Sequence, residues 1–259
     1  MTADNASQRT VRINIKRQAS PDASPRWEAF DVPCSPGDGT NITSVLEYIA
    51  AHPRTVDGVD TTPVTYDAAC LEEVCGSCTM VINGHVRQGC SQLVDRLLEE
   101  APEITIEPMS KFPVVRDLAV NRERLFKDFQ RIQGWVPIDG SYALGPGPKE
   151  SPENQDVRYR LSRCMACGCC LEACPQYTFD NDFVGAAVIS QVRYFNRHET
   201  GSRLEDERLE EMMKPGGVNH CGQAQNCVKV CPKEIPLTES IAEVGRATTR
   251  NAFRRIFIK

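Results

Sequence analysis

The sequence has no hydrophobic run long enough to cross a membrane. Its longest uninterrupted apolar stretch, Phe183 to Ile189, is far shorter than the roughly 18 to 20 residues that span a bilayer. The N-terminal stretch, Met1 to Thr10, lacks both the charged-then-apolar pattern of an export signal and the Arg-rich pattern of a transit sequence. We therefore expect a chain that is made and used in a bacterial cytoplasm.

An excess of positive charge is also missing. The formal net charge is -5, whereas a nucleic-acid binder gains affinity from a basic surface that releases counterions at phosphates. We therefore expect no nucleic-acid partner. No G-x-G-x-x-G motif follows a strand-like segment, so no dinucleotide fold is expected either.

Length and composition are those of an ordinary globular protein. The chain has 259 residues, which exceeds the usual size of one domain, so two domains are expected. Hydrophobic content of 41% and charged content of 25% exclude a wholly disordered, collagen-like or coiled-coil chain. We place the boundary after Phe112, giving domains 1–112 and 113–259.

The first domain has the hydrophobic pattern of a small sheet with one helix. Alternating apolar residues in 10–17, and shorter alternations at 30–32 and 104–106, predict strands. The Asn83-Gly84 pair predicts a tight hairpin turn, because these residues tolerate positive φ. Four apolar residues share one face of a predicted helix: Ile42, Val45, Leu46 and Ile49.

Beyond residue 112 the apolar period becomes helical, so the fold class predicted is α+β with an all-α second domain. The residues at helical spacing are Leu118, Leu125, Phe126 and Phe129, then Val188, Val192 and Phe195, and finally Ile241 and Val244. The stretch 133–154 is rich in Gly, Pro and polar residues and is longer than an average connection. It is predicted to be a structured surface loop or a partner contact.

Thirteen cysteines are the unusual feature of the composition. Disulfides stabilise small secreted proteins, but this chain is too large to need them and shows no export signal. The cysteines also fall into three tight groups with the spacings of metal ligands. Thiolates that bind metal are therefore favoured over disulfides.

The first group has the spacing of a plant-type [2Fe-2S] site. It reads C-x4-C-x2-C, with a fourth cysteine after the predicted hairpin, and comprises Cys70, Cys75, Cys78 and Cys90. Three thiolates on one loop can surround a two-iron core only if the backbone curls, and Gly76 relieves crowding there. The alternative is a structural zinc site, whose usual pattern is two separated C-x2-C pairs.

The second and third groups form an internal repeat. The second has the bacterial ferredoxin spacing C-x2-C-x2-C-x3-C-P and comprises Cys164, Cys167, Cys170 and Cys174. The third repeats this spacing with Cys221, Cys227 and Cys231, but Ala224 replaces its second cysteine. In such runs the last cysteine binds the cluster of the other run.

This crossover rule gives each cluster its ligands. Three cysteines of the second group, with Cys231, can hold [4Fe-4S]; Cys174, Cys221 and Cys227 supply only three thiolates. A methyl group at Ala224 cannot bind iron, so [3Fe-4S] is expected, with a [4Fe-4S] cluster that takes water or an outside ligand as the alternative. Cys34 and Cys169 are left as buried thiols.

In this order, the motifs resemble those of iron-sulfur subunits of succinate dehydrogenases and fumarate reductases. Three further segments carry the resemblance: 163–170, 190–193 and 226–233. The resemblance implies a plant-type ferredoxin-like (β-grasp) domain followed by a helical domain like bacterial ferredoxin.

The resemblance also implies an electron-transfer role in respiratory complex II. Electrons would pass from FAD of a flavoprotein subunit through [2Fe-2S], [4Fe-4S] and [3Fe-4S] to membrane quinone, without dehydrogenation by this chain alone. A membrane anchor subunit would hold the chain peripherally on the cytoplasmic face of the bacterial inner membrane. The same chain of clusters can run in reverse in a fumarate reductase.

The family's quinone pocket lies beside [3Fe-4S], which implies a vicinity formed by Pro175, Phe179 and His220. Members that use ubiquinone commonly have a tryptophan near Pro175 and a histidine directly after the first cysteine of the last run. Here Gly222 follows that cysteine and His220 precedes it. The sequence is more similar to the branch with a two-haem cytochrome b anchor and menaquinone.

Two other classes of function remain as alternatives. A soluble ferredoxin would need neither the 133–154 loop nor two fused domains. A zinc-stabilised binding module would contain zinc in place of iron and acid-labile sulfide.

Overall fold

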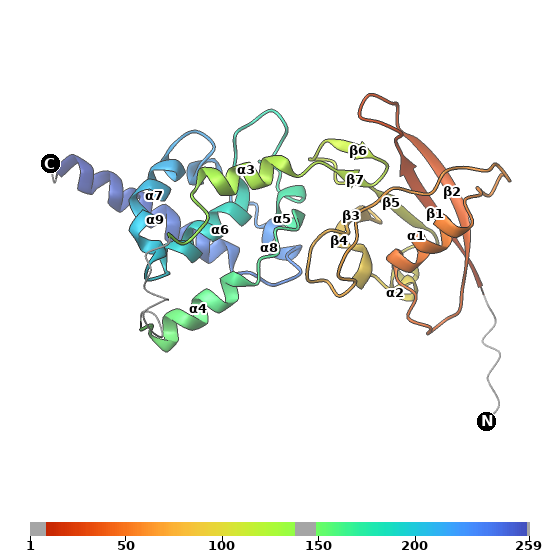
Figure 1. Ribbon diagram of the computed structural model, residues 1–259, viewed down its shortest axis with the longest axis horizontal. Helices are drawn as coiled ribbons and strands as arrows, with labels where there is room; N and C mark the ends of the chain where they lie inside the picture. The colour runs from red at the N-terminus through yellow and green to blue at the C-terminus, as the bar shows by residue number, and fades with distance from the viewer. Residues whose placement is uncertain (1–8, 138–148, 258–259) are drawn as a thin grey trace. The chain divides into compact units, whose positions relative to one another are not determined.

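The computed structural model describes residues 9–137 and 149–257. They form two compact units, Met1–Asn121 and Arg122–Lys259, whose elements are shown in Figure 1. Most of the N-terminal stretch considered for an export signal, and the middle of the loop expected at 133–154, lie outside the described residues. Within those ranges no helix has both the length and the apolar character needed to cross a bilayer.

A five-stranded mixed sheet forms the first unit. Its strands are β1 (Arg9–Arg17), β2 (Arg26–Cys34), β3 (Thr79–Ile82), β4 (His85–Gln88) and β5 (Ile104–Glu107), in the order β2-β1-β5-β3-β4. β1 runs antiparallel to β2 and parallel to β5, and β3 is antiparallel to β4 and β5. The strands expected from alternation are therefore confirmed, as is the hairpin around Asn83, whose φ is 49°.

Helix α1 (Ile42–Ala51) supplies the apolar face that packs with the sheet. Its four predicted core residues are at most 1% exposed and belong to one hydrophobic cluster with Ile13, Phe30 and Ile106. Asn41 caps the helix by accepting a hydrogen bond from the Ser44 backbone N–H at 3.0 Å. A second short helix, α2 (Val94–Glu100), was not predicted from the sequence.

The segment after residue 112 begins with a hairpin, so the helical role predicted for Leu118 is wrong. Strands β6 (Val114–Arg116) and β7 (Ala119–Val120) form a second small sheet, and the first unit continues to Asn121. The turn residue Asp117 has a φ of 49° and accepts hydrogen bonds from Arg17 at 2.8 and 3.0 Å. This buried ion pair holds the turn against β1.

Helices and short loops build the second unit. The helices are α3 (Glu123–Arg131), α4 (Pro152–Ser162), α5 (Cys169–Glu172), α6 (Gly185–Asn196), α7 (Glu205–Met213), α8 (Asn226–Lys229) and α9 (Leu237–Phe257). Among the described residues there are also three short 3-10 turns: η1 (Gly89–Ser91), η3 (Gly201–Leu204) and η4 (Val218–His220). Helix α6 is central, since eight of its residues are buried. The α+β fold class is confirmed.

Polar contacts hold α6, α7 and α9 in place. Arg193 of α6 and Arg197, directly after this helix, each lie 2.8 Å from Glu243 of α9. Arg208 of α7 is fully buried and donates hydrogen bonds to the backbone oxygens of Gln133 at 3.1 Å and Trp135 at 2.9 Å. Arg208 therefore fixes the first residues of the long connection to the helical unit.

Candidate metal centres

The first cysteine group lies on a curled loop without regular secondary structure. Leu71, Glu73 and Gly76 have φ values of 59°, 54° and 73°, so the backbone folds back on itself. This curl directs three backbone N–H groups at one sulfur: those of Glu72, Val74 and Cys75 donate to Cys70 Sγ, at 3.4, 3.3 and 3.3 Å. Amide donors of this kind stabilise a thiolate.

The β3–β4 hairpin brings the remaining thiols to this loop. Cys78 precedes β3 and Cys90 lies in η1 directly after β4, and the Gly89 N–H donates to the Cys78 carbonyl at 2.9 Å. Hydrogen bonds from Ser77 lower the pKa of Cys75 to about 6. Burial is the main cause that raises the pKa of Cys90 to about 11, and interactions with Cys78 and Cys70 contribute to this shift. The four predicted [2Fe-2S] cysteines therefore lie together.

The second and third cysteine groups share one backbone conformation. Ala166 and Gly168 flank Cys167 with φ values of 52° and 90°, and Gln223 and Gln225 flank Ala224 with φ values of 54° and 59°. Each run then enters a helix of four residues, α5 or α8. The structural repeat therefore places Ala224 at the position that corresponds to Cys167.

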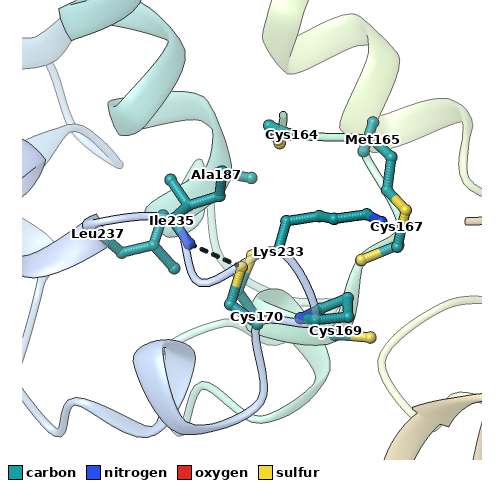
Figure 2. Close-up of a pocket in the computed structure, with 13 residues that line it drawn as sticks. Cys164, Met165, Cys167, Cys169, Cys170, Ala187, Lys233, Ile235 and Leu237 are labelled. Carbon is teal, nitrogen blue, oxygen red and sulfur yellow. Dashed lines mark hydrogen bonds between the residues drawn. The ribbon is translucent and has the colours of Figure 1, made fainter. Parts of the chain in front are cut away.

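Five cysteines line one cavity of the helical unit: Cys169 and the four predicted [4Fe-4S] ligands, Cys164, Cys167, Cys170 and Cys231. We call it the four-thiol cavity, after the four predicted ligands. Figure 2 shows the cavity, with the Ile235 backbone N–H donating to Cys231 Sγ at 3.4 Å. The last cysteine of the third group thus lies with the first three of the second group, as the crossover interpretation expects.

Electrostatics in this cavity favour a bound cationic core. Burial is the main cause that raises the pKa of Cys164 to about 11 and that of Cys170 well above its ordinary value, and the charges of neighbouring thiolates contribute to both shifts. A hydrogen bond from the Cys169 thiol is the main cause that lowers the pKa of Cys167 to about 7, with a smaller contribution from Arg122. Thiolates must be deprotonated to bind metal, so iron among these sulfurs would offset their burial and mutual repulsion.

A second cavity is lined by three thiols, with the Ala224 methyl group at the position of the missing cysteine. Cys174, Cys221, Cys227 and Ala224 line it together. Burial raises the pKa of Cys227, and the charges of Cys174 and Cys221 add to this effect. The donor set fits an iron-sulfur core with one corner that receives no protein ligand. In the described part of the chain, no three metal-binding side chains converge on a single-ion position; the cysteines line cavities.

Helices α6 and α9 are shared walls of the two cavities. Ala187 of α6 lines the four-thiol cavity and its neighbour Ala186 lines the three-thiol cavity. Helix α9 contributes Leu237 to the first and Ile241 to the second. Small residues are needed at the start of α6, because a Cβ on Gly185 would lie 2.1 Å from Leu171 Cδ2. The two cavities are therefore adjacent.

The three residues predicted near a quinone are placed differently from one another. Pro175 lines the three-thiol cavity. Phe179 is 54% exposed and His220 is exposed, and neither lines that cavity. His220 Nδ1 accepts a hydrogen bond from the Gly216 backbone N–H at 3.2 Å. Their role beside a quinone stays a prediction.

Sequence reasoning missed three polar residues that line the three-thiol cavity: Gln223, Gln225 and Asn226. A fourth carboxamide, Gln176, lies in the stretch after Cys174 where the resemblance implies a quinone pocket. Gln176 lies over Gly222, where an added Cβ would be 2.8 Å from Gln176 Nε2. Comparing the two runs as a repeat identifies Gln223 and Gln225, because they flank Ala224 as Ala166 and Gly168 flank Cys167.

Comparison with protein families agrees with this arrangement. A family model of a 2Fe-2S iron-sulfur cluster binding domain matches residues 12–127. A family model of a 4Fe-4S dicluster domain matches residues 160–235. The first cysteine group lies inside the first match, and the second and third groups lie inside the second.

Similar proteins cover almost the whole chain. It is 50% identical to the succinate dehydrogenase iron-sulfur subunit of Bacillus subtilis over 252 residues, which is 97% of this chain and 98% of the relative. It is 31% identical to the fumarate reductase iron-sulfur subunit of Wolinella succinogenes over 185 residues, 71% of this chain and 77% of the relative.

A solved structure has the same fold. A chain of the Mycobacterium smegmatis Sdh1 complex in the apo form superposes with a TM-score of 0.77 at 19% identity, covering 95% of this chain and 98% of the other. The two matching iron-sulfur domain models, the shared fold and the identity of 50% to the Bacillus relative agree with one another. The chain therefore belongs to the family of iron-sulfur subunits of succinate dehydrogenases and fumarate reductases.

Proposed function

We propose that the chain is the electron-transfer subunit of a succinate:quinone oxidoreductase, and that it carries three clusters. The observation that supports this most strongly is the exchange of cysteines between the two runs, which leaves Ala224 as the fourth member of the three-thiol cavity. Iron-sulfur clusters carry one electron at a time, so a row of them links a two-electron flavin to a two-electron quinone.

Each cluster has its own ligand set in this proposal. The [2Fe-2S] cluster is held by Cys70, Cys75, Cys78 and Cys90; [4Fe-4S] by Cys164, Cys167, Cys170 and Cys231; and [3Fe-4S] by Cys174, Cys221 and Cys227. Amide donors of the curled loop stabilise the negative charge of the first site. Apolar residues of α6 and α9 shield one side of each of the other two sites from water.

Two other subunits complete the enzyme. A flavoprotein with FAD oxidises succinate, because this chain has no dinucleotide-binding motif of its own. An integral membrane anchor holds the chain peripherally on the cytoplasmic face of the bacterial inner membrane. The chain's own contribution is the placement, insulation and tuning of the clusters.

The quinone in this proposal binds beside the [3Fe-4S] cluster, and it is menaquinone. Gly222 stands where ubiquinone-using members commonly have a histidine, and Gln176 covers it. The corresponding anchor is a two-haem cytochrome b. Visible spectra of the purified complex test this: two haem b per chain are expected, and a haem-free anchor contradicts it.

Succinate oxidation is the favoured direction over fumarate reduction. The identity of 50% to a succinate dehydrogenase subunit exceeds the 31% to a fumarate reductase subunit, and it extends over more of the chain. Fumarate reductase is the second candidate, because the same clusters conduct in both directions.

Anaerobic addition of succinate to the purified complex tests the proposed function. Succinate should bleach the visible absorbance of the clusters, and an oxidised quinone should restore it. The isolated chain should not be reduced by succinate. Robust succinate oxidation by the purified chain, or clusters in the complex that succinate and quinone leave unchanged, would contradict the proposal.

A further inference from the structure

The two adjacent cavities differ in charge. Among the described residues that line the four-thiol cavity, Lys233 has the only charged side chain besides the cysteines. The described lining of the three-thiol cavity contains carboxamides but no Lys, Arg, Asp or Glu. One cluster site therefore has an ammonium group beside it, and the other has neutral polar groups.

This difference occurs at equivalent positions of the structural repeat. Lys233 follows Cys231-Pro232, and Gln176 follows Cys174-Pro175. The hydrogen bonds before these pairs also correspond: Cys174 N–H donates to the Leu171 carbonyl and Cys231 N–H to the Val228 carbonyl. The residue after each Cys-Pro pair thus faces the cavity to which that cysteine belongs.

The Lys233 ammonium is not neutralised by the protein. Lys233 is half-buried, and the described residues contain no carboxylate or other polar group bonded to its side chain. Figure 2 shows the side chain extending across the cavity in the direction of Cys167. Its charge is therefore directed at the sulfurs in a site where burial weakens solvent screening.

We propose that the residue after each Cys-Pro pair tunes the reduction potential of the adjacent cluster. Lys233 raises the potential of [4Fe-4S], whereas the neutral Gln176 gives [3Fe-4S] no such increase. Reduction adds one electron to a core already surrounded by thiolates. A nearby cation stabilises this added negative charge, so it favours the reduced state and raises the potential. Lys233 acts on the cluster through its charge alone, and it binds neither iron nor quinone.

This inference rests on the proposed function and its ligand sets. The experiment distinguishes failure of the inference from failure of the proposed function. Redox titration of the assembled complex, followed by low-temperature electron paramagnetic resonance, measures each cluster's midpoint potential. Lys233→Gln should lower the reduced-to-oxidised ratio of [4Fe-4S] at a fixed potential by about tenfold, which is about 59 mV for one electron. Lys233→Arg should keep the wild-type potential, because it keeps the charge.

The reciprocal change tests the same rule at the other cavity. Gln176→Lys should raise the [3Fe-4S] potential, by less than the shift at Lys233 because residue 176 is exposed, and should leave [4Fe-4S] nearly unchanged. Lys127→Gln is the matched control, since this lysine's side chain is 66% exposed on α3 and its charge is screened by solvent. It should shift neither cluster.

Two results would overturn the inference. One is a [4Fe-4S] potential in Lys233→Gln equal to that of wild type and Lys127→Gln; the other is a Gln176→Lys complex with an unshifted [3Fe-4S] potential. Absence of the cluster signals in the wild-type complex would instead contradict the proposed function, because the spectra show whether each cluster is present whatever its potential.

Discussion

Replacing Ala224 with cysteine should convert the three-iron centre into a four-iron centre. Ala224 is flanked by Gln223 and Gln225 in left-handed conformations, as Cys167 is by its neighbours. A cysteine at this position should therefore direct its sulfur into the three-thiol cavity, as Cys167 does in the other cavity. Ala224 is exposed, so the added sulfur has space, and stability should change by no more than about 0.5 kcal/mol.

The gain in iron affinity can be estimated per ligand. Structural zinc sites with four ligands bind with roughly 10–16 kcal/mol, which is about 3 kcal/mol for each ligand. On that scale a fourth thiolate retains the fourth iron about 100-fold better. We therefore expect the [3Fe-4S] signal of the oxidised complex to almost disappear in Ala224→Cys.

Electron paramagnetic resonance of the oxidised and reduced complex, with iron analysis, measures this conversion. Ala224→Val is the matched control, since it adds bulk without a donor and should keep the three-iron signal. A full [3Fe-4S] signal in Ala224→Cys, with unchanged iron content, would refute the crossover assignment of ligands.

Two further predictions concern buried carboxylates. Asp117→Asn should lower the free energy of unfolding of the first unit by about 3 kcal/mol, because it breaks a buried ion pair. The Arg17 and Asp117 side chains of this pair are 1% and 2% exposed. In denaturant unfolding, the exposed control Asp31→Asn should lower the free energy of unfolding by less than about 1 kcal/mol. Burial raises the pKa of Asp128 to about 6 from 3.8. The folded state therefore holds this proton more tightly, and stability should fall by up to about 3 kcal/mol as the pH rises from 4 to 7. Asp128→Asn should remove that part of the pH dependence in unfolding experiments at pH 5 and pH 7, and an unaltered dependence would contradict the assigned cause.

The elements that could be predicted are those whose signal is local. The alternation before Arg17, the Asn83-Gly84 turn and the helix face that begins at Ile42 need no distant partner, and each is found where expected. The three cysteine groups are equally local, since their spacing is fixed by loops that surround a small core. The helix predicted at Leu118 is wrong because the helical spacing of this residue to Leu125 is accidental. It lies in a turn whose conformation depends on the contact between Asp117 and Arg17, 100 residues away in the chain.

Most residues that line the two cavities could not be predicted from the sequence, because only the folded chain brings them together. Spacing alone indicated that Cys231 and Cys174 exchange between runs, but not that Lys233 and Gln176 accompany them. Neither residue type is a metal ligand here, so a search for ligands passes over both. Their position becomes informative only when the two runs are compared as folded copies.

In our proposal the thiolates hold three iron-sulfur clusters, of which one lacks an iron at the Ala224 corner. Low-temperature electron paramagnetic resonance of the native complex can detect all three clusters, and iron, zinc and acid-labile sulfide analysis gives the metal content. We predict a [3Fe-4S] signal in the oxidised complex and [2Fe-2S] and [4Fe-4S] signals after reduction. Zinc in place of iron, or a second four-iron cluster with no three-iron signal, would contradict the account.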